Sequence, residues 1–177
     1  MPRPVSPILF VGIFLLGAVI ALGSRHPAAA QDSGGDKQFV EAAAELGLSR
    51  IAGAEDALTR VRDNRVRILA ERIIEDHRPI NEELALLATD AGIPIPEPPA
   101  LLITAASSEE GTAFDQTWLK AEADAHEEMI RLFEGQAADG KDAKLRTFAA
   151  NHLAALRDHL DIARSLGAEL PPVTSAK

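Results

Sequence analysis

The sequence predicts an all-α protein that folds as an antiparallel four-helix bundle. Apolar residues recur every three or four positions in four stretches of about 25 residues, which is the periodicity of helices with one buried face. Outside the N-terminal segment, the alternating pattern of β-branched and aromatic residues that marks strands is weak. Two tight turns and one longer connection join the four stretches, as a helical bundle requires.

The first helix is expected from about Lys37 to Arg62. A linker over residues 31–36, rich in Gly, Ser and Asp, precedes it, and Asp36 is placed to cap its first turn. An Asp-Asn pair directly after Arg62 interrupts the pattern. The apolar positions of this helix are Phe39, Ala43, Leu46, Ile51, Ala54, Leu58 and Val61.

The second helix is expected to end at Gly92 and Pro94, because glycine favours a left-handed cap and proline cannot continue a helix. Pro79 lies inside this helix and should kink it, unless the carbonyl of Glu75 finds another partner for the lost N–H donor. The periodic positions are Val66, Leu69, Ile73, His77, Ile80, Leu84 and Leu87.

The prolines in residues 93–99 predict an extended crossover. A third helix should follow a capping box formed by Ser107 and Glu110. Its periodic positions are Phe114, Trp118, Glu122, His126, Met129 and Phe133.

The fourth helix is expected after a turn at Asp139-Gly140 and should close with Gly167 at its cap. We expect an up-down-up-down order, a bundle domain over residues 37–168 and a C-terminal tail over residues 169–177. The periodic positions are Leu145, Phe148, His152, Leu156, His159, Ile162 or Ala163, and Leu166.

Residues 1–30 have the pattern of a secretory signal peptide. Arg3 provides the positive end, an apolar run extends over Ile8–Leu22, and Ala28–Ala30 supply the small residues of a cleavage site before Gln31. The run is shorter than the roughly 20 residues of an unstrained membrane helix, so we favour cleavage over the alternative of an uncleaved N-terminal anchor. The expected location is the periplasm or another extracytoplasmic space, without stable membrane insertion after cleavage.

The composition excludes several classes of protein. The chain has 27 acidic and 18 basic residues, a formal net charge of -9, which argues against nucleic-acid binding. The absence of cysteine excludes disulfides, cysteine zinc sites, thiol nucleophiles, iron–sulfur clusters and a lipid anchor on cysteine. The acidic surplus is interpreted as solubility charge, with an unidentified protein partner as the alternative.

Histidines carry the most informative chemistry. His77, His126, His152 and His159 all fall on the apolar faces of their helices, and a bundle would bring them to similar depth. Neutral imidazoles from several helices suit zinc or copper. The alternative is a layer of core polar residues, satisfied by neighbouring side chains or water, that could act as a pH sensor.

The candidate metal site rests on three of these histidines, with further residues around them. The candidate ligands are His77, His126 and His159, the candidate additional ligands are His152 and Glu122, and Asn81 is a candidate for orienting the ring of His77. One divalent transition metal, zinc or copper, is the expected cofactor, if there is one.

Catalytic motifs are not evident in the sequence. Two-iron bundles use Glu-x-x-His pairs, but the residues three positions before the four histidines are Ile74, Ala123, Ala149 and Leu156. No glycine-rich phosphate loop or serine nucleophile motif occurs. We therefore assign no catalytic residues, and enzymatic activity remains an open question.

Several short motifs together resemble the domain-of-unknown-function 4142 family, a ferritin-like group of exported bacterial proteins often labelled outer-membrane proteins. The resemblance spans about Lys37 to Leu166 and implies a four-helix bundle, an envelope location and no established catalytic activity. The motifs are Phe39, Val66-x-x-x-Ala70, Asp76-His77-x-x-x-Asn81-x-x-Leu84, Gly92-Ile93-x-x-Pro96, Phe114-Asp115, His126 and Leu153-x-x-Leu156-x-x-His159-Leu160.

The resemblance implies that His77, Asn81, His126 and His159 match residues of the family, whereas His152 is particular to this chain. Two positions depart from the family pattern. Arg50 stands where the family usually has an acidic residue, with Glu45 or Glu55 as candidate substitutes, and Ala154 stands in place of a proline. Two functions therefore stay open: a non-catalytic periplasmic bundle that binds a divalent metal, and an envelope stress or interaction module without metal.

Overall fold

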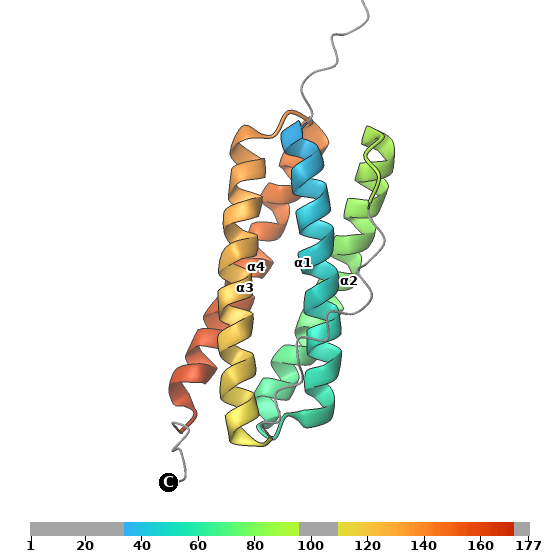
Figure 1. Ribbon diagram of the computed structural model, residues 1–177. Helices are drawn as coiled ribbons and strands as arrows, with labels where there is room; N and C mark the ends of the chain where they lie inside the picture. The colour runs from blue at the N-terminus through green and yellow to red at the C-terminus, as the bar shows by residue number, and fades with distance from the viewer. Residues whose placement is uncertain (1–33, 96–109, 172–177) are drawn as a thin grey trace, which may run out of the picture. The chain divides into compact units, whose positions relative to one another are not determined.

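The computed structural model describes residues 34–95 and 110–171, and these residues form four helices (Figure 1). The helices are α1 (Gly34–Arg60), α2 (Asn64–Ala91), α3 (Thr112–Asp139) and α4 (Ala143–Glu169). The predicted all-α four-helix bundle is therefore confirmed. The expected signal segment at residues 1–30, most of the crossover and residues 172–177 of the tail lie outside the described residues.

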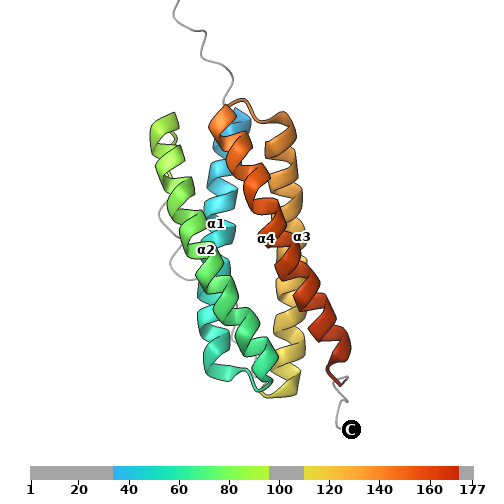
Figure 2. The same cartoon turned by 180° about the vertical axis from the view of Figure 1, so that it is seen from behind.

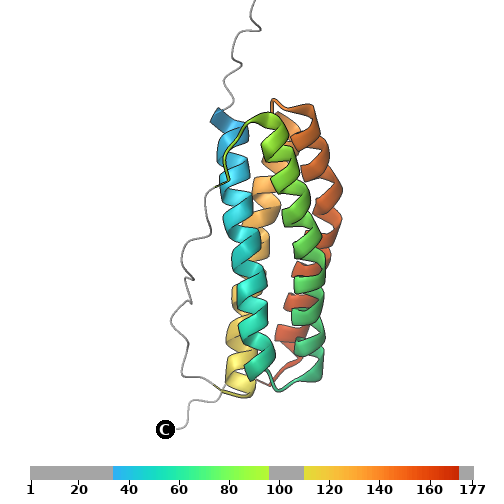
Figure 3. The same cartoon turned by 90° about the vertical axis from the view of Figure 1, so that its right-hand side faces the viewer.

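The helices form two hairpins, α1–α2 and α3–α4, which meet along the α1–α3 and α2–α4 contacts (Figures 1 and 2). In each of these four contacts the helices are antiparallel, but α2 and α3 run in the same direction (Figure 3). The expected up-down-up-down order is therefore wrong. At roughly 3.3 Å per residue, a chain of the length between Ile95 and Glu110 can span a whole helix. The sequence pattern therefore did not distinguish an up-down-up-down order from one in which the second and third helices run in the same direction.

Side-chain and backbone caps close several helix ends, and of these only the glycine cap of α2 was predicted from the sequence. The side chain of Asp63 accepts the N–H of Arg65 at 2.8 Å, and that of Asp142 accepts the N–H of Lys144 at 2.7 Å. Gly92 closes α2 in the left-handed conformation, with φ of 69°, as predicted. α2 continues as one helix past Pro79.

Three predicted boundaries are wrong. α1 begins at Gly34, so Asp36 lies within its first turn and does not cap it. α3 begins after Gly111, whose φ of 66° suits a residue without a side chain, so the expected box at Glu110 does not cap this helix. α4 continues through Gly167 to Glu169 and stops before Pro171, because a glycine inside a helix costs only about 1 kcal/mol whereas a proline cannot continue it.

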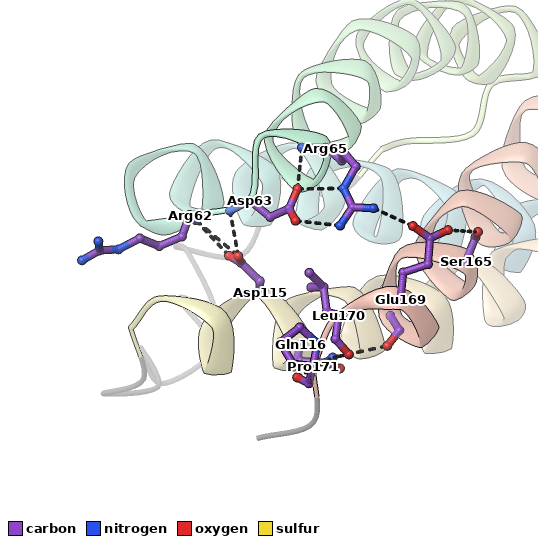
Figure 4. Close-up of polar contacts among 10 residues, drawn as sticks. Arg62, Asp63, Arg65, Asp115, Gln116, Ser165, Glu169, Leu170 and Pro171 are labelled. Carbon is purple, nitrogen blue, oxygen red and sulfur yellow. Dashed lines mark hydrogen bonds and ion pairs between the residues drawn. The ribbon is translucent and has the colours of Figure 1, made fainter. Parts of the chain in front are cut away.

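Two buried aspartates join the hairpins at their ends. Asp115 of α3 accepts the backbone N–H groups of Arg62 and Asp63 at 3.1 and 2.9 Å, which ties down the α1–α2 turn (Figure 4). At the other end, Asp36 of α1 accepts those of Lys141 and Asp142 at 2.9 and 2.8 Å. Each hairpin thus supplies a carboxylate that accepts the backbone N–H groups in the turn of the other hairpin.

The apolar core is divided into two clusters. One holds aromatic residues from α1, α3 and α4, including Phe39, Phe133 and Phe148. The other packs around Trp118 and Leu69, towards the opposite end of the helices. Between the two clusters, the buried positions of α2, α3 and α4 are taken by histidine. None of the four helices in the described part of the chain combines the length and apolar character that a membrane span needs.

Candidate metal centre

Three histidines meet in the centre of the bundle. His77 comes from α2, His126 from α3 and His159 from α4, and each is fully buried. Their ring centroids lie 5.2 to 5.6 Å apart. One ring nitrogen of each lies within 4.8 Å of the others, so one ion could be shared after small side-chain movements. We call these three residues the histidine triad.

Hydrogen bonds fix the orientation of two rings in the triad. The Nδ1 atom of His126 lies 2.8 Å from the backbone carbonyl oxygen of Glu122, and the Nε2 atom of His159 lies 2.9 Å from Oδ2 of Asp76. Because both partners are acceptors, these two nitrogens carry the protons. The opposite nitrogens, Nε2 of His126 and Nδ1 of His159, therefore hold lone pairs.

Those lone pairs find no hydrogen-bond donor among the described residues. Nε2 of His126, Nδ1 of His159 and both ring nitrogens of His77 are buried without a partner. Buried polar atoms are normally paired, because leaving one unsatisfied costs about 1–3 kcal/mol. The donor set is therefore what a metal ion would satisfy: one free imidazole nitrogen from each of three helices.

Burial keeps the triad neutral. It lowers the pKa of His77 to about 3, with further lowering from the other two imidazoles and from Arg50. Burial also lowers the pKa of His126, to about 4. The pKa of His159 is lowered by burial too, although Asp76 opposes that change. Neutral imidazole is the form that binds a metal, so the triad needs no deprotonation near pH 7.

Glu122 lies beside the triad but faces Arg50. Its Oε1 atom accepts a hydrogen bond from Nη1 of Arg50 at 3.2 Å, across the α1–α3 contact. Its Oε2 atom lies 3.6 Å from Nδ1 of His126, the nitrogen that already donates to the backbone. Burial raises the pKa of Glu122 to about 7, against the opposing effect of Arg50. Glu122 therefore lies behind the ring of His126, away from its free nitrogen.

Two other predicted residues lie outside the triad. His152 is partly exposed, with its Nε2 atom 3.0 Å from Oε2 of Glu83 and its ring centroid 4.7 Å from that of Phe148. Asn81 packs against Gly47, so closely that a Cβ atom at Gly47 would lie 2.1 Å from the Asn81 Oδ1 atom. Both nitrogens of His77 are unpartnered, so Asn81 does not orient its ring by a hydrogen bond.

Asp76 is the site residue that pattern reasoning missed. It precedes His77 on α2, yet its carboxylate holds His159 of α4. The helical pattern could place Asp76 on α2 but not pair it with α4, because that pairing depends on the register between hairpins. The suggested acidic substitutes in α1 do not reach the triad: Glu45 is exposed, and Glu55 forms an ion pair with Arg78 at 2.7 Å.

Comparisons with known proteins agree with this fold. Residues 21–166 match the family described as a domain of unknown function, DUF4142, which confirms the resemblance drawn from the sequence. No curated protein matches the chain.

Solved structures of similar fold include a conserved hypothetical protein, rv2844, from Mycobacterium tuberculosis. It has a TM-score of 0.69 and 13% identity, and the match covers 83% of this chain and 99% of that one. CopM in its Cu(II)-bound form has a TM-score of 0.65 and 15% identity over 75% of this chain and 95% of its own. CopM co-crystallised with silver has a TM-score of 0.66 and 15% identity over 77% and 98%. At these identities the likeness shows the fold alone.

Proposed function

The chain belongs to the DUF4142 family, whose function is unknown, and we propose that it is an exported, non-catalytic bundle protein that binds one zinc or copper ion at the histidine triad. The observation that carries this proposal is the set of unpartnered ring nitrogens of His77, His126 and His159, which converge in the core. Stability alone gives no reason to bury them, since apolar side chains would fill the same space without unsatisfied atoms.

The ligand set favours zinc or copper over harder metals. Three imidazole nitrogens suit borderline and soft transition metals, whereas magnesium and calcium prefer oxygen ligands. α1 contributes no histidine, so a fourth position would be left to water or to another small ligand. Structures of CopM, which shares the fold, exist in Cu(II)-, Cu(I)- and silver-bound forms, and this is consistent with metal binding by such a bundle.

The periplasmic location is part of the same proposal and rests on the N-terminal sequence. Arg3, the apolar run over Ile8–Leu22 and the small residues Ala28–Ala30 support export and cleavage before Gln31. N-terminal sequencing of the protein recovered from the periplasm of an exporting host tests it. A mature N-terminus at Gln31 supports cleavage, and an intact Met1 in the membrane fraction supports the N-terminal tether.

Calorimetric titration of the exported protein with zinc and with copper(II) tests the binding function. We expect one ion per chain in the unmodified protein and loss of binding in H77Q and in H159Q. H152Q is the matched control, because His152 lies on the same helix as His159 but outside the triad, and it should still bind one ion. Circular dichroism of each variant confirms that the helices have formed.

The alternative function, an envelope module without metal, predicts a different result. In that case neither metal binds the unmodified protein, and the histidines act as a polar core layer that responds to pH. The same titration therefore distinguishes the two functions.

A further inference from the structure

The triad is closed to solvent, so an arriving ion must pass between helices. His77, His126 and His159 are each fully buried, and apolar clusters lie above and below them along the bundle. An approach along the bundle axis would cross those clusters. The remaining approaches are the four lateral contacts between helices.

The α2–α4 contact carries acidic groups from the surface to the histidines (Figure 2 shows this face). Asp76 pairs with His159 at 2.9 Å, and Glu83 pairs with His152 at 3.0 Å. The two acids are seven residues apart on α2 and the two histidines seven apart on α4, so each set shares one helical face two turns apart.

In each of these pairs the acidic side chain is more exposed to solvent than the histidine. The side chains of Asp76 and Glu83 are 39% and 49% exposed, whereas that of His152 is 21% exposed and that of His159 is fully buried. A cation can meet both carboxylates in solvent. Because Asp76 bonds directly to a member of the triad, its carboxylate joins the surface to the site.

The α1–α3 contact presents the opposite charge. The guanidinium of Arg50 lies there, paired with the buried Glu122. Its positive charge adds to burial in lowering the pKa values of His77 and His126, which places the charge close to the triad. A metal ion approaching past Arg50 would meet repulsion in a poorly solvated region.

The contacts within each hairpin also disfavour passage. α1 and α2 approach closely at Gly47, where the side chain of Asn81 fills the space that a Cβ would occupy. The α3–α4 contact is bridged by two ion pairs, Arg157 with Glu134 and Arg164 with Glu127, so each of these carboxylates at its surface is already held by a guanidinium.

Arg72 covers the acidic side. Its Nη2 atom lies 2.5 Å from Oδ2 of Asp158, and its Nε atom lies 3.5 Å from Oδ2 of Asp76. The latter oxygen is the one that accepts the hydrogen bond from His159. A cation that approaches Asp76 must therefore compete with this guanidinium.

We propose that the metal ion enters the histidine triad through the α2–α4 contact, received by the carboxylates of Asp76 and Glu83, and that Arg72 restricts this entrance. The proposal rests on the proposed metal-binding function. It assigns roles in ion access to residues outside the ligand set.

Stopped-flow mixing of the protein with Zn²⁺ alone tests this route. The association rate constant is measured through competition with a zinc-sensitive dye. We expect R72Q to raise the association rate constant and E83Q to lower it, each by roughly threefold to tenfold at low salt, with smaller effects at high salt. The matched controls are R78Q and E55Q, which remove the ion pair between α2 and α1 without touching the α2–α4 face.

The route is overturned if R72Q and E83Q bind zinc at the rates of R78Q and E55Q. That result would leave the proposed function intact, because the final amount of bound zinc is measured in the same experiment. Absence of zinc binding by the unmodified protein would instead overturn the proposed function, and the access route with it.

Discussion

At the scale of single residues, the triad is defined as much by its supporting groups as by its histidines. The backbone oxygen of Glu122 and the carboxylate of Asp76 each hold one ring nitrogen, which leaves the other nitrogen of His126 and His159 free. Such partners fix the tautomer and direction of metal-binding imidazoles in known sites. His77 has no such partner among the described residues, so its ring is free to present either nitrogen.

We expect the effect of G47A on the free energy of unfolding to depend on the side chain at position 81. An added Cβ would lie 2.1 Å from the Asn81 Oδ1 atom and 2.9 Å from its Cγ, so we expect G47A to lower the free energy of unfolding by about 1–3 kcal/mol. In the N81A background the clash is gone, and the same substitution should stabilise α1 by up to about 1 kcal/mol, as alanine does in helices.

Urea denaturation of the single and double variants measures both effects. G135A is the control, because a Cβ at this glycine of α3 meets nothing within 4 Å. A destabilising effect of G47A that persists unchanged in the N81A background would contradict the close contact.

At the scale of helices, sequence periodicity predicted the four elements and their buried faces well. Phe39, Leu69, Phe133 and Leu156 are all buried as their spacing indicated. The order of the helices was not predictable in this way, since periodicity describes which face of a helix is buried and carries no information about which neighbour covers it. The same limit explains why Asp76 was missed and why His152 was grouped with the triad.

We expect the stability of the bundle to depend on how Asp115 holds the turn between α1 and α2. Asp115 is buried and accepts the N–H groups of both Arg62 and Asp63 (Figure 4). We expect D115A to lower the free energy of unfolding by about 2–3 kcal/mol, because two N–H groups lose their acceptor. D115N keeps a carbonyl oxygen and should lose less.

Chemical denaturation of both variants measures this effect, with D56A as the control. Asp56 is an exposed α1 residue in a surface ion pair with Arg60, so its removal should change stability by about 0.5 kcal/mol or less. Equal effects of D115A and D56A would contradict the role of Asp115 in joining the hairpins.

At the scale of the whole molecule, the polar layer between two apolar clusters makes stability depend on pH. The pKa values of His77 and His126 are about 3 and about 4 in the folded protein, against an ordinary value of 6.5. Below pH 6.5 the unfolded chain therefore takes up protons that the folded protein does not. Each such proton lowers the free energy of unfolding by about 1.4 kcal/mol per pH unit as the pH falls.

Glu122 acts in the opposite sense. Its pKa of about 7 exceeds the ordinary value of 4.5, so its cost to stability grows as the pH rises between those values. Two histidines outweigh one glutamate, and we expect the metal-free protein to lose stability from pH 7 to pH 5, more steeply in E122Q. Urea denaturation at pH 7, 6 and 5 measures this, and equal or greater stability at pH 5 would contradict a neutral buried triad.

The bundle as a whole thus combines a fold that the sequence predicts with a site that only the packed structure defines. Three histidines were identifiable from their positions on apolar faces, but their free nitrogens depend on contacts between helices. We propose that these three imidazoles together hold one ion. X-ray absorption spectroscopy of the zinc-loaded protein tests it most directly. Three imidazole nitrogens at about 2.0 Å from the metal are the predicted result, and coordination by oxygen atoms alone would contradict it.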